Sequence, residues 1–323
     1  MPIRRPVSRD FGKLNVPALL VAIVGPTAVG KSALALRLAE NFGGEIVSAD
    51  SRQVYRFLDI GTAKPTCAEQ ARVPHHLIDL INPDQPFGLA EYQAQALCVI
   101  EEIGARGALP ILAGGTGQYV WAVLENWAVP RVPPDLALRR FLEERAGRDG
   151  GGALYTELMR LNPGTAARID PRNIRRLIRA LEISYLGGDA PAKRPPPFKS
   201  LIVGLRAPRP ELYRRIEVRL DGMIAGGFLD EVRQLRDAGY GADLPALSSI
   251  GYRQILQHLS GKLSLAEALA AINIDSHRLV RQQYNWFKPT DERISWFDAT
   301  EESYPEISRL VSEFLSRSQL GGL

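Results

Sequence analysis

Cysteine is scarce in this sequence and long apolar runs are absent, and each of these absences excludes a class of protein. Cys67 and Cys98 are the two cysteines among 323 residues, and they lie far apart without metal-ligand spacing. They indicate a reducing cytoplasm and no structural zinc. No run of about 18 apolar residues occurs, so no membrane span is expected. Residues 1–17 are basic and polar without an apolar core, which predicts an N-terminal tail and no signal peptide.

The chain also lacks an acidic strand end of the kind that holds Mg²⁺ in ATPases and kinases. That feature usually consists of a few apolar residues followed by Asp. The strand-like segment PILAGG ends in glycine, and the nearest match, LID at residues 77–79, is short. This absence argues against nucleotide hydrolysis.

What the sequence does contain is the composition of a globular protein, with 45% apolar and 24% charged residues. Its length predicts about two domains, or one domain with a large insertion. The net charge of +4 and the pI of about 9.1 favour an acidic partner. No dimer seam is evident, so we expect a monomer without an obligate protein partner.

A phosphate-binding pattern, GPTAVGKS, occupies residues 25–32. A branched apolar run at Ala18–Val24 precedes it, and a helical pattern at Lys31–Phe42 follows and ends at two glycines. In this order, backbone N–H groups and a helix N-terminus face an anion. Lys31 would reach the outer phosphates, and the Ser32 hydroxyl would face a Mg²⁺ ion. The predicted loop residues are Gly25, Pro26, Thr27, Ala28, Val29, Gly30, Lys31 and Ser32.

Strand and helix patterns then alternate along the chain, with a strand at 45–49, a helix at 89–106, a strand at Leu109–Ala113 and a helix opened by GGTGQY at 114–119. This alternation predicts an α/β fold, with a P-loop-type parallel sheet and helices on both faces. Ligands of such sheets bind beyond the carboxyl ends of the strands. The loop at 25–32, Asp50 and Thr116 are therefore expected to share one cleft.

The composition changes near Asn126, where the chain becomes helical and arginine-rich. A connector, GGDAPAKRPPPF, follows, and LIVGL at 201–205 is typical of a strand that returns to the sheet. We therefore expect an inserted, mainly helical domain at 126–199, within a catalytic core made of residues 18–125 and 200–315. From Glu211 onward the pattern is mostly helical.

Within the predicted insertion, DPRNIRRLIRALEISY at 170–185 predicts a helix with Asp170 as N-cap and Pro171 at the first helical position. Its arginines fall within about 100° of one another, opposite an apolar face, and no acid shares their stripe. The arginines are Arg172, Arg175, Arg176 and Arg179. Polyanion binding is favoured over a merely solvated face. A second basic stretch at 277–289 holds Tyr284, Trp286 and Phe287, which we expect in the core.

One carboxylate, Asp50, stands at a predicted strand end in the cleft. Beside a bound phosphate it would serve as a general base for a nucleophile that attacks the phosphate-bearing substrate. A helix N-cap and a kinase Mg²⁺ ligand are alternatives that spacing leaves open. Arg219, in YRRIEVRLDGM, is a candidate anion clamp that the local pattern does not distinguish from its neighbours.

Together these segments resemble the tRNA dimethylallyltransferases, also called tRNA isopentenyltransferases. The matching pieces are GPTAVGKS, SADSRQVYRFLDIGTAKP, PHHLIDL, GGTGQY, RNIRRLIRALE and SSIGYRQ, in family order from about residue 20 to about 298. The eukaryotic members' C-terminal zinc finger is absent, so the resemblance is to the bacterial form. Gln118 stands where a Leu is more usual, and Arg281-Gln282-Gln283 replaces a more common Lys-Arg-Gln.

The resemblance implies transfer of a dimethylallyl group from dimethylallyl diphosphate to N6 of adenosine 37, beside the tRNA anticodon, with Mg²⁺. It implies that Asp50 takes the N6 proton, that Thr116 contacts substrate and that Lys31 and Arg219 stabilise the leaving diphosphate held by Thr27 to Ser32. The implied tRNA contacts are Asp50, Ser51, Arg52, Gln53, Thr116, Arg139, Arg175, Arg176, Leu177, Ile178 and Arg179.

Three other functions remain open at this stage. An adenylate isopentenyltransferase would use AMP as acceptor and would not need the arginine-rich insertion. A small-molecule P-loop kinase would transfer phosphate from ATP. An RNA-binding ATPase module would transfer neither group.

Overall fold

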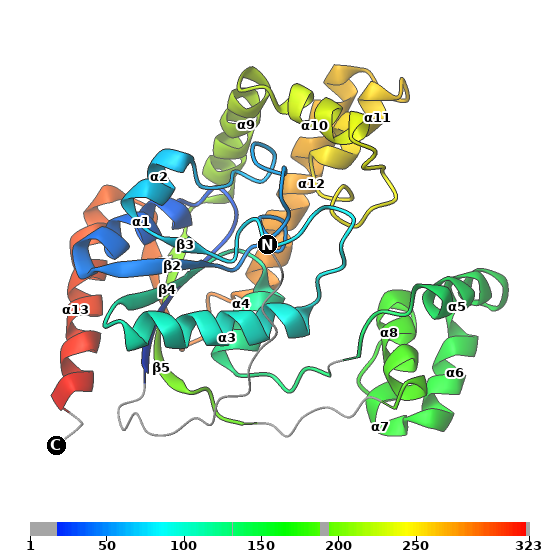
Figure 1. Cartoon of the computed structure of the whole chain (residues 1–323), viewed down its shortest axis with the longest axis horizontal. Coiled ribbons are helices and arrows are strands. Elements are labelled where there is room, and N and C mark those ends of the chain that lie inside the picture. Colours follow the sequence, from blue (N-terminus) through cyan, green and yellow to red (C-terminus); the bar gives the residue numbers. More distant parts are fainter. Residues whose placement is uncertain (1–17, 131, 188–193, 321–323) are drawn as a thin grey trace.

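The computed structural model describes residues 18–130, 132–187 and 194–320, so the predicted N-terminal tail lies outside the described residues. Over this part of the chain, six strands form one parallel sheet in the order β3-β2-β4-β1-β5-β6 (Figure 1). The strands are β1 (Ala18–Val24), β2 (Gly44–Ser48), β3 (His75–His76), β4 (Leu109–Ala113), β5 (Phe198–Arg206) and β6 (Ile294–Asp298). The predicted α/β class is confirmed.

The central strand β1 is buried on both faces, as its run of apolar residues predicts. Leu20, Ala22 and Val24 belong to one apolar cluster, which also contains residues of α3 (Leu89–Ala105) and α4 (Gly117–Leu124). Val21 and Ile23 belong to a second cluster, with residues of α1 (Lys31–Phe42) and α13 (Tyr304–Leu320). Alternate side chains of a strand point to opposite faces, so this division places helices on both sides of the sheet.

A group of later helices reaches the loops at the carboxyl ends of the strands. It consists of α9 (Arg209–Ala225), α10 (Phe228–Asp237), α11 (Tyr252–Leu259) and α12 (Leu265–Trp286), and it lies at the top of Figure 1, whereas the short α2 (Cys67–Arg72) lies lower and to the left. Residues of α10, α11 and α12 join the cluster that covers the α3 face of the sheet. The C-terminal part of the chain therefore helps to enclose the loops built by the first part.

Four helices of the predicted insertion stand apart from the sheet (Figure 1, green). They are α5 (Leu136–Asp149), α6 (Gly151–Leu161), α7 (Pro163–Ala166) and α8 (Ile174–Tyr185). They share an apolar cluster of their own, centred on Leu142, Leu154, Leu158, Leu177 and Leu181. Because this cluster is separate from those that cover the sheet, we propose that residues 126–199 fold as an inserted unit.

Two expectations about local structure need correction. α8 begins at Ile174, and its N-cap is Asn173, whose side chain accepts a hydrogen bond from the Arg176 N–H; Asp170 and Pro171 precede the helix. An Asn oxygen satisfies an unpaired helix N–H as well as an Asp oxygen does, so Asn173 takes the role that was expected of Asp170. The edge strands β3 and β6 were not predicted: β3 has two residues, too few to form a pattern, and β6 lies in a segment that was expected to be mostly helical.

Several predicted segments were confirmed closely. β1, α1 and β4 have the expected bounds, and β2, α3 and β5 differ from the expected segments at their ends only. Phe287 is buried, while Tyr284 and Trp286 are partly buried against the core. No helix in the described ranges is long and apolar enough to cross a bilayer.

Candidate active site

The loop between β1 and α1 has a backbone that few residues can adopt. Gly25, Ala28 and Gly30 have φ angles of 140°, 62° and 100°. A Cβ atom at Gly25 would lie 2.4 Å from the Leu205 carbonyl oxygen, so glycine is required there for close packing against β5. None of the hydrogen bonds within the described part of the chain uses the backbone N–H groups of residues 28–32. These groups form a nest for an anion at the start of α1.

Lys31, the first residue of α1, lies beneath this loop. Its Nζ donates a hydrogen bond of 2.6 Å to the Pro26 carbonyl oxygen. Burial lowers the pKa of Lys31 to about 7, the negative charge of Asp50 partly opposes this change, and Arg219 adds to it. The Lys31 amine therefore lies near Asp50 and Arg219, and it loses its proton more readily than an exposed lysine does.

Asp50 and Thr116 meet where β2 and β4 end. The Thr116 N–H donates to the Ala49 carbonyl oxygen over 3.1 Å, and the Thr116 hydroxyl oxygen accepts from the Ser51 N–H over 3.0 Å. One oxygen of Asp50 accepts from the Arg52 N–H at 2.8 Å, a local turn that fixes the carboxylate. Because β2, β4 and β1 are neighbours in the sheet, the three segments predicted to converge do so.

The structure selects Arg219 from the arginines of α9, which the sequence could not do. Arg214 and Arg215 both bind the Glu211 carboxylate. Arg219, one turn beyond Arg215, donates instead to the Thr27 hydroxyl oxygen over 2.9 Å. Its guanidinium group is therefore brought to the phosphate loop from a helix nearly two hundred residues away.

Gln283 is a site residue that the sequence reasoning missed. This buried side chain of α12 accepts a hydrogen bond of 2.7 Å from the Thr27 N–H and donates one of 3.1 Å to the Gly115 carbonyl oxygen. A buried glutamine in a helix gives no pattern that separates it from other polar residues. The resemblance drew attention to this segment only through its neighbours Arg281 and Gln282, because Gln283 itself matches the usual family residue.

Arg52 and Gln53, which follow Asp50, are largely engaged inside the protein. The Gln53 side chain accepts from the Ser48 hydroxyl and donates to the carbonyl oxygens of Thr62 and Ala63. Arg52 donates to the Pro245 carbonyl oxygen over 2.8 Å. These bonds position the loop. Any contacts of residues 50–53 with RNA are therefore expected from polar atoms that are not used in these bonds.

The donor set beside the loop fits a hydrated divalent ion better than a tightly caged one. The Ser32 side chain is exposed, and its hydroxyl makes no hydrogen bond in the described ranges, where no group of three or more His, Cys, Asp or Glu side chains could hold a metal. Mg²⁺ commonly takes few protein ligands and completes its shell with water and substrate phosphates. A single hydroxyl is compatible with such an ion.

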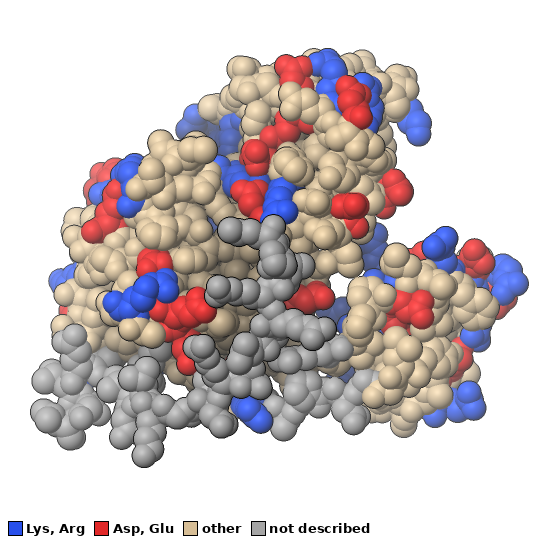
Figure 2. Space-filling model, viewed as in Figure 1, with Lys and Arg blue, Asp and Glu red and all other residues tan. Residues whose placement is uncertain are grey.

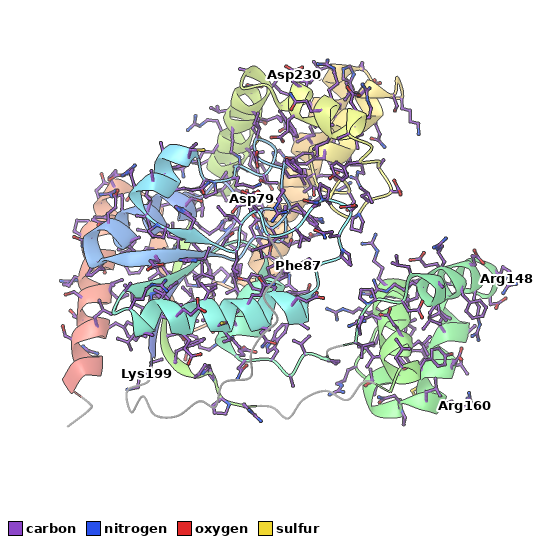
Figure 3. The ribbon with its side chains drawn as sticks, viewed as in Figure 1. Asp79, Phe87, Arg148, Arg160, Lys199 and Asp230 are labelled. Atoms are coloured by element: carbon purple, nitrogen blue, oxygen red, sulfur yellow. The ribbon has the colours of Figure 1, made fainter. Side chains whose placement is uncertain are left out.

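Asp79 ends LID, the segment that comes nearest to the pattern of an acidic strand end, and its carboxylate pairs with Lys64 (Figure 3). Its carboxylate lies 2.6 Å from the buried ammonium group of Lys64, which also contacts Asp59. Asp79 follows the edge strand β3, which is separated from β1 by two strands. It therefore cannot serve the phosphate loop as a kinase metal ligand would.

The predicted arginine face of the insertion is partly an internal ion-pair network. The Glu182 side chain has no exposed surface, and it binds Arg139 and Arg179. Arg179 also donates to the Val132 carbonyl oxygen. The expectation that no acid shares the arginine stripe is therefore wrong, because Glu182 lies one turn beyond Arg179 and closes on it.

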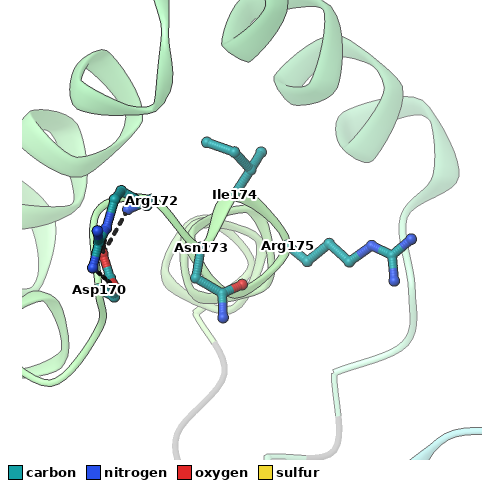
Figure 4. A pocket seen from close by; sticks show the side chains of 5 residues that line it. All are labelled: Asp170, Arg172, Asn173, Ile174 and Arg175. Carbon is teal, nitrogen blue, oxygen red and sulfur yellow. Dashed lines mark hydrogen bonds and ion pairs between the residues drawn. The ribbon is translucent and has the colours of Figure 1, made fainter. Parts of the chain in front are cut away.

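Two further corrections concern the same helix. Leu177 and Ile178 are buried in the cluster of α5–α8, so their side chains cannot contact RNA while this packing holds. Arg172 precedes α8 and pairs with Asp170, and Figure 4 shows it on the opposite side of the helix from Arg175. Arg175 and Arg176 are exposed and form no ion pair with any described residue. On the face seen in Figure 2, basic and acidic side chains of the bundle are interspersed.

Comparisons with known proteins agree with this geometry. A family model described as IPP transferase matches residues 53–290, and one described as isopentenyl transferase matches residues 18–79. The chain is 52% identical over 273 residues to a tRNA dimethylallyltransferase of Roseiflexus sp. (strain RS-1), covering 83% of this chain and 90% of the relative. It is 46% identical over 303 residues to a tRNA dimethylallyltransferase of Dehalococcoides mccartyi, covering 93% of each.

Solved structures show the same likeness. The crystal structure of a tRNA isopentenylpyrophosphate transferase from Bacillus halodurans is 39% identical, with a TM-score of 0.70 over 94% of this chain and 98% of that one. A eukaryotic dimethylallyltransferase acting on tRNA superposes with a TM-score of 0.76 over 93% of this chain and 80% of its own. At 24% identity, the second comparison bears on the fold alone.

Proposed function

This chain belongs to the tRNA dimethylallyltransferases, and we propose that it transfers a dimethylallyl group from dimethylallyl diphosphate to N6 of adenosine 37, beside the anticodon of tRNA. The observation that carries the proposal is the convergence of Asp50, Lys31 and Arg219 on one phosphate loop from three separate elements. An anion nest supplies the site for the diphosphate, and a carboxylate across the cleft supplies a base.

Asp50 is proposed as the base because the acceptor is a weak nucleophile. The lone pair of an adenine N6 amine is delocalised into the ring, so removing a proton as the new C–N bond forms is useful. A positioned general base contributes roughly 10²- to 10⁴-fold. In this step N6 bonds to the first carbon of the dimethylallyl group, the C–O bond to diphosphate breaks, and the N6 proton passes to Asp50.

The phosphate loop is proposed to hold the leaving group. Negative charge grows on the diphosphate as the allylic C–O bond breaks, and preorganised donors stabilise it most at that point. These donors are the Lys31 ammonium group, the Arg219 guanidinium group and the free N–H groups of residues 28–32. A Mg²⁺ ion beside Ser32 would neutralise further charge on the diphosphate when bound.

The tRNA is proposed to reach the cleft with its target nucleotide turned out of the anticodon stack, since a stacked base cannot present N6 to Asp50. Thr116 and the segment at 50–53 are proposed to contact the flipped adenosine, since they follow the strand ends beside the phosphate loop. Arg175 and Arg176 are the exposed cations of α8 and would contact loop phosphates. We place the reaction in the cytoplasm, where unpaired thiols such as Cys67 and Cys98 are stable.

A labelled-donor experiment separates the proposal from its rivals. Dimethylallyl diphosphate labelled in the allylic group is supplied with Mg²⁺ and, in parallel, with unmodified tRNA, AMP or ATP plus candidate phosphate acceptors. We expect label on tRNA at one adenosine and none on AMP. Label on AMP with unlabelled tRNA would support the adenylate enzyme, and consumption of ATP alone would support a kinase or an ATPase.

A further inference from the structure

Gln283 joins two loops of the proposed active site that no other described side chain joins. It lies near the C-terminal end of α12, with 5% of its surface exposed. Its Oε1 accepts from the Thr27 N–H of the phosphate loop over 2.7 Å, and its Nε2 donates to the Gly115 carbonyl oxygen of the β4–α4 loop over 3.1 Å. The loops follow neighbouring strands, so this bridge spans the carboxyl ends of β1 and β4.

The bridge needs a side chain that can both donate and accept hydrogen bonds, as an amide does. The two loops present one backbone N–H and one backbone C=O, so the group between them must accept from the first and donate to the second. A carboxylate only accepts and an ammonium group only donates. A buried amide with both bonds made is stable, whereas a group that leaves the N–H and the C=O unpaired incurs the desolvation cost of both.

Gly115 of the β4–α4 loop and Gly117, the first residue of α4, make room for the end of α12. A Cβ atom at Gly115 would lie 2.3 Å from the Gln283 Nε2 and 3.7 Å from the Lys31 Nζ. A Cβ atom at Gly117 would lie 2.2 Å from the Trp286 ring. The Trp121 ring of α4 also donates to the Trp286 carbonyl oxygen over 3.0 Å. The last turn of α12 is therefore seated on this loop, and Gln283 points from it to the phosphate loop.

The bridge determines which polar groups of Thr27 remain available to a ligand. Its N–H is occupied by Gln283, so it does not donate to the diphosphate with the amides that follow it. Its hydroxyl accepts from Arg219 over 2.9 Å. Gln283 thereby holds Thr27 in place, and the Thr27 hydroxyl in turn accepts the hydrogen bond from the Arg219 guanidinium group.

We propose that Gln283 is a positioning residue for the diphosphate: it sets the spacing between the phosphate loop and the Gly115 loop and, through Thr27, the place of Arg219. The inference rests on the proposed function. It goes beyond that function because it assigns α12 a part in donor binding and removes the Thr27 N–H from the diphosphate ligands.

Steady-state kinetics with dimethylallyl diphosphate test the proposal. Gln283→Met keeps the length of the side chain but makes neither bond, and Gln283→Glu keeps the acceptor while placing a second acceptor against the Gly115 carbonyl. Gln282→Glu makes the same charge change at the exposed neighbouring position of α12. KM for the donor is measured at saturating tRNA, with KM for tRNA and the melting temperature of each variant.

We expect Gln283→Met to raise KM for the donor about tenfold, with KM for tRNA within twofold of wild type. Gln283→Glu should raise donor KM further, because it adds negative charge beside the diphosphate. Gln282→Glu should leave donor KM within twofold. The proposal would be overturned if folded variants of Gln283 had a donor KM within twofold of wild type. It would also be overturned if the variants lowered kcat only in proportion to the fraction of unfolded enzyme.

Gly115→Ala provides a second route if residue 283 tolerates no change. Its methyl group would displace the same amide while residue 283 stays glutamine, so donor KM should rise in the same direction. An unchanged donor KM in folded Gly115→Ala enzyme would also count against the bridge. If wild type itself labels no tRNA, the proposed function fails; if wild type is active and these variants match it, only the role of Gln283 fails.

Discussion

The Lys31 side chain shows how a single residue can be prepared for its ligand. Burial beside Arg219 lowers its pKa to about 7, despite the opposing charge of Asp50. A bound diphosphate adds negative charge next to this amine and must raise the pKa again. Donor binding is therefore linked to proton uptake by the enzyme.

The proton uptake can be measured directly. At pH 8 a lysine with a pKa of about 7 is about nine-tenths neutral, so binding should take up about 0.9 proton per site, falling to about a half at pH 7. Inorganic diphosphate is titrated calorimetrically into the enzyme–tRNA complex in buffers of different ionisation enthalpy. Lys31→Met should bind more weakly and show no such uptake. Uptake that is the same in Lys31→Met and wild type would assign the proton to another group.

Asp50 is the residue on which turnover should depend most. Asp50→Asn keeps the size of the side chain and can still accept from the Arg52 N–H, but it cannot take a proton. We expect kcat to fall by roughly 10²- to 10⁴-fold, with the dissociation constant for tRNA changed by no more than a few fold. Single-turnover rates and filter binding give the two numbers. Near-normal turnover in Asp50→Asn would exclude it as the base.

At the scale of elements, α8 combines packing with the two arginines that we propose for RNA binding. Arg179, with Arg139 of α5, neutralises the buried Glu182 carboxylate, which also accepts from the Asp135 N–H. Burial alone would raise the pKa of Glu182, but its hydrogen bonds to Arg139 and Arg179 outweigh burial and lower it. The stability that Glu182 contributes is thus present above its ordinary pKa of 4.5 and is lost as the pH falls below it. The exposed turn of α8 is left with Arg175 and Arg176 for RNA.

The salt dependence of tRNA binding tests whether Arg175 and Arg176 contact RNA. The double change Arg175→Gln and Arg176→Gln should weaken tRNA binding and reduce the slope of log K against log salt by roughly 0.7 to 0.9 per arginine. The matched control changes Arg148 of α5 and Arg160 of α6, exposed arginines on the side of the same bundle that faces away from the sheet (Figure 3). Equal slopes for the two double variants would mean that α8 has no special place in RNA binding.

At the scale of the whole molecule, the C-terminal helices hold the loops of the first half in place. Glu231 of α10 accepts from the N–H groups of Asp59, Ile60 and Gly61, and the Tyr252 hydroxyl of α11 donates to it over 2.6 Å. A Cβ atom at Gly61 would lie 2.3 Å from the Phe228 ring, so only glycine permits this approach. The segment after Asp50 is in this way tied to helices that follow it by about 170 residues.

Loss of this carboxylate should loosen both the fold and the site. Glu231→Gln replaces one acceptor oxygen by an NH₂ group that faces backbone N–H groups, and it removes the charge that strengthens the remaining bonds. We expect the free energy of unfolding to fall by about 2 to 3 kcal/mol. Urea denaturation measures it, with the exposed Glu217→Gln of α9 as control, which should change it by less than about 0.5 kcal/mol. A change of similar size in both variants would contradict the role of Glu231 as an anchor.

The sequence by itself determined the parts whose causes are local. The apolar run of β1, the glycine-rich turn and the helical pattern of α1 lie within about two dozen neighbouring residues, so their propensities and spacing predicted the loop and its Lys31. The alternation of strands and helices determined the parallel sheet, and strand ends then brought Asp50 and Thr116 to that loop.

Only the tertiary structure decided which long side chains act together. Arg219 reaches Thr27 across 192 residues of sequence and Gln283 reaches it across 256, while Arg214, Arg215 and Arg179 are taken up by nearby acids. An arginine or a glutamine can bind any suitable partner within its reach, and the sequence does not say which partner packing will bring there. The local sequence pattern determines the backbone of the phosphate loop. The packing of distant helices determines that Arg219 and Gln283 are the side chains that contact it.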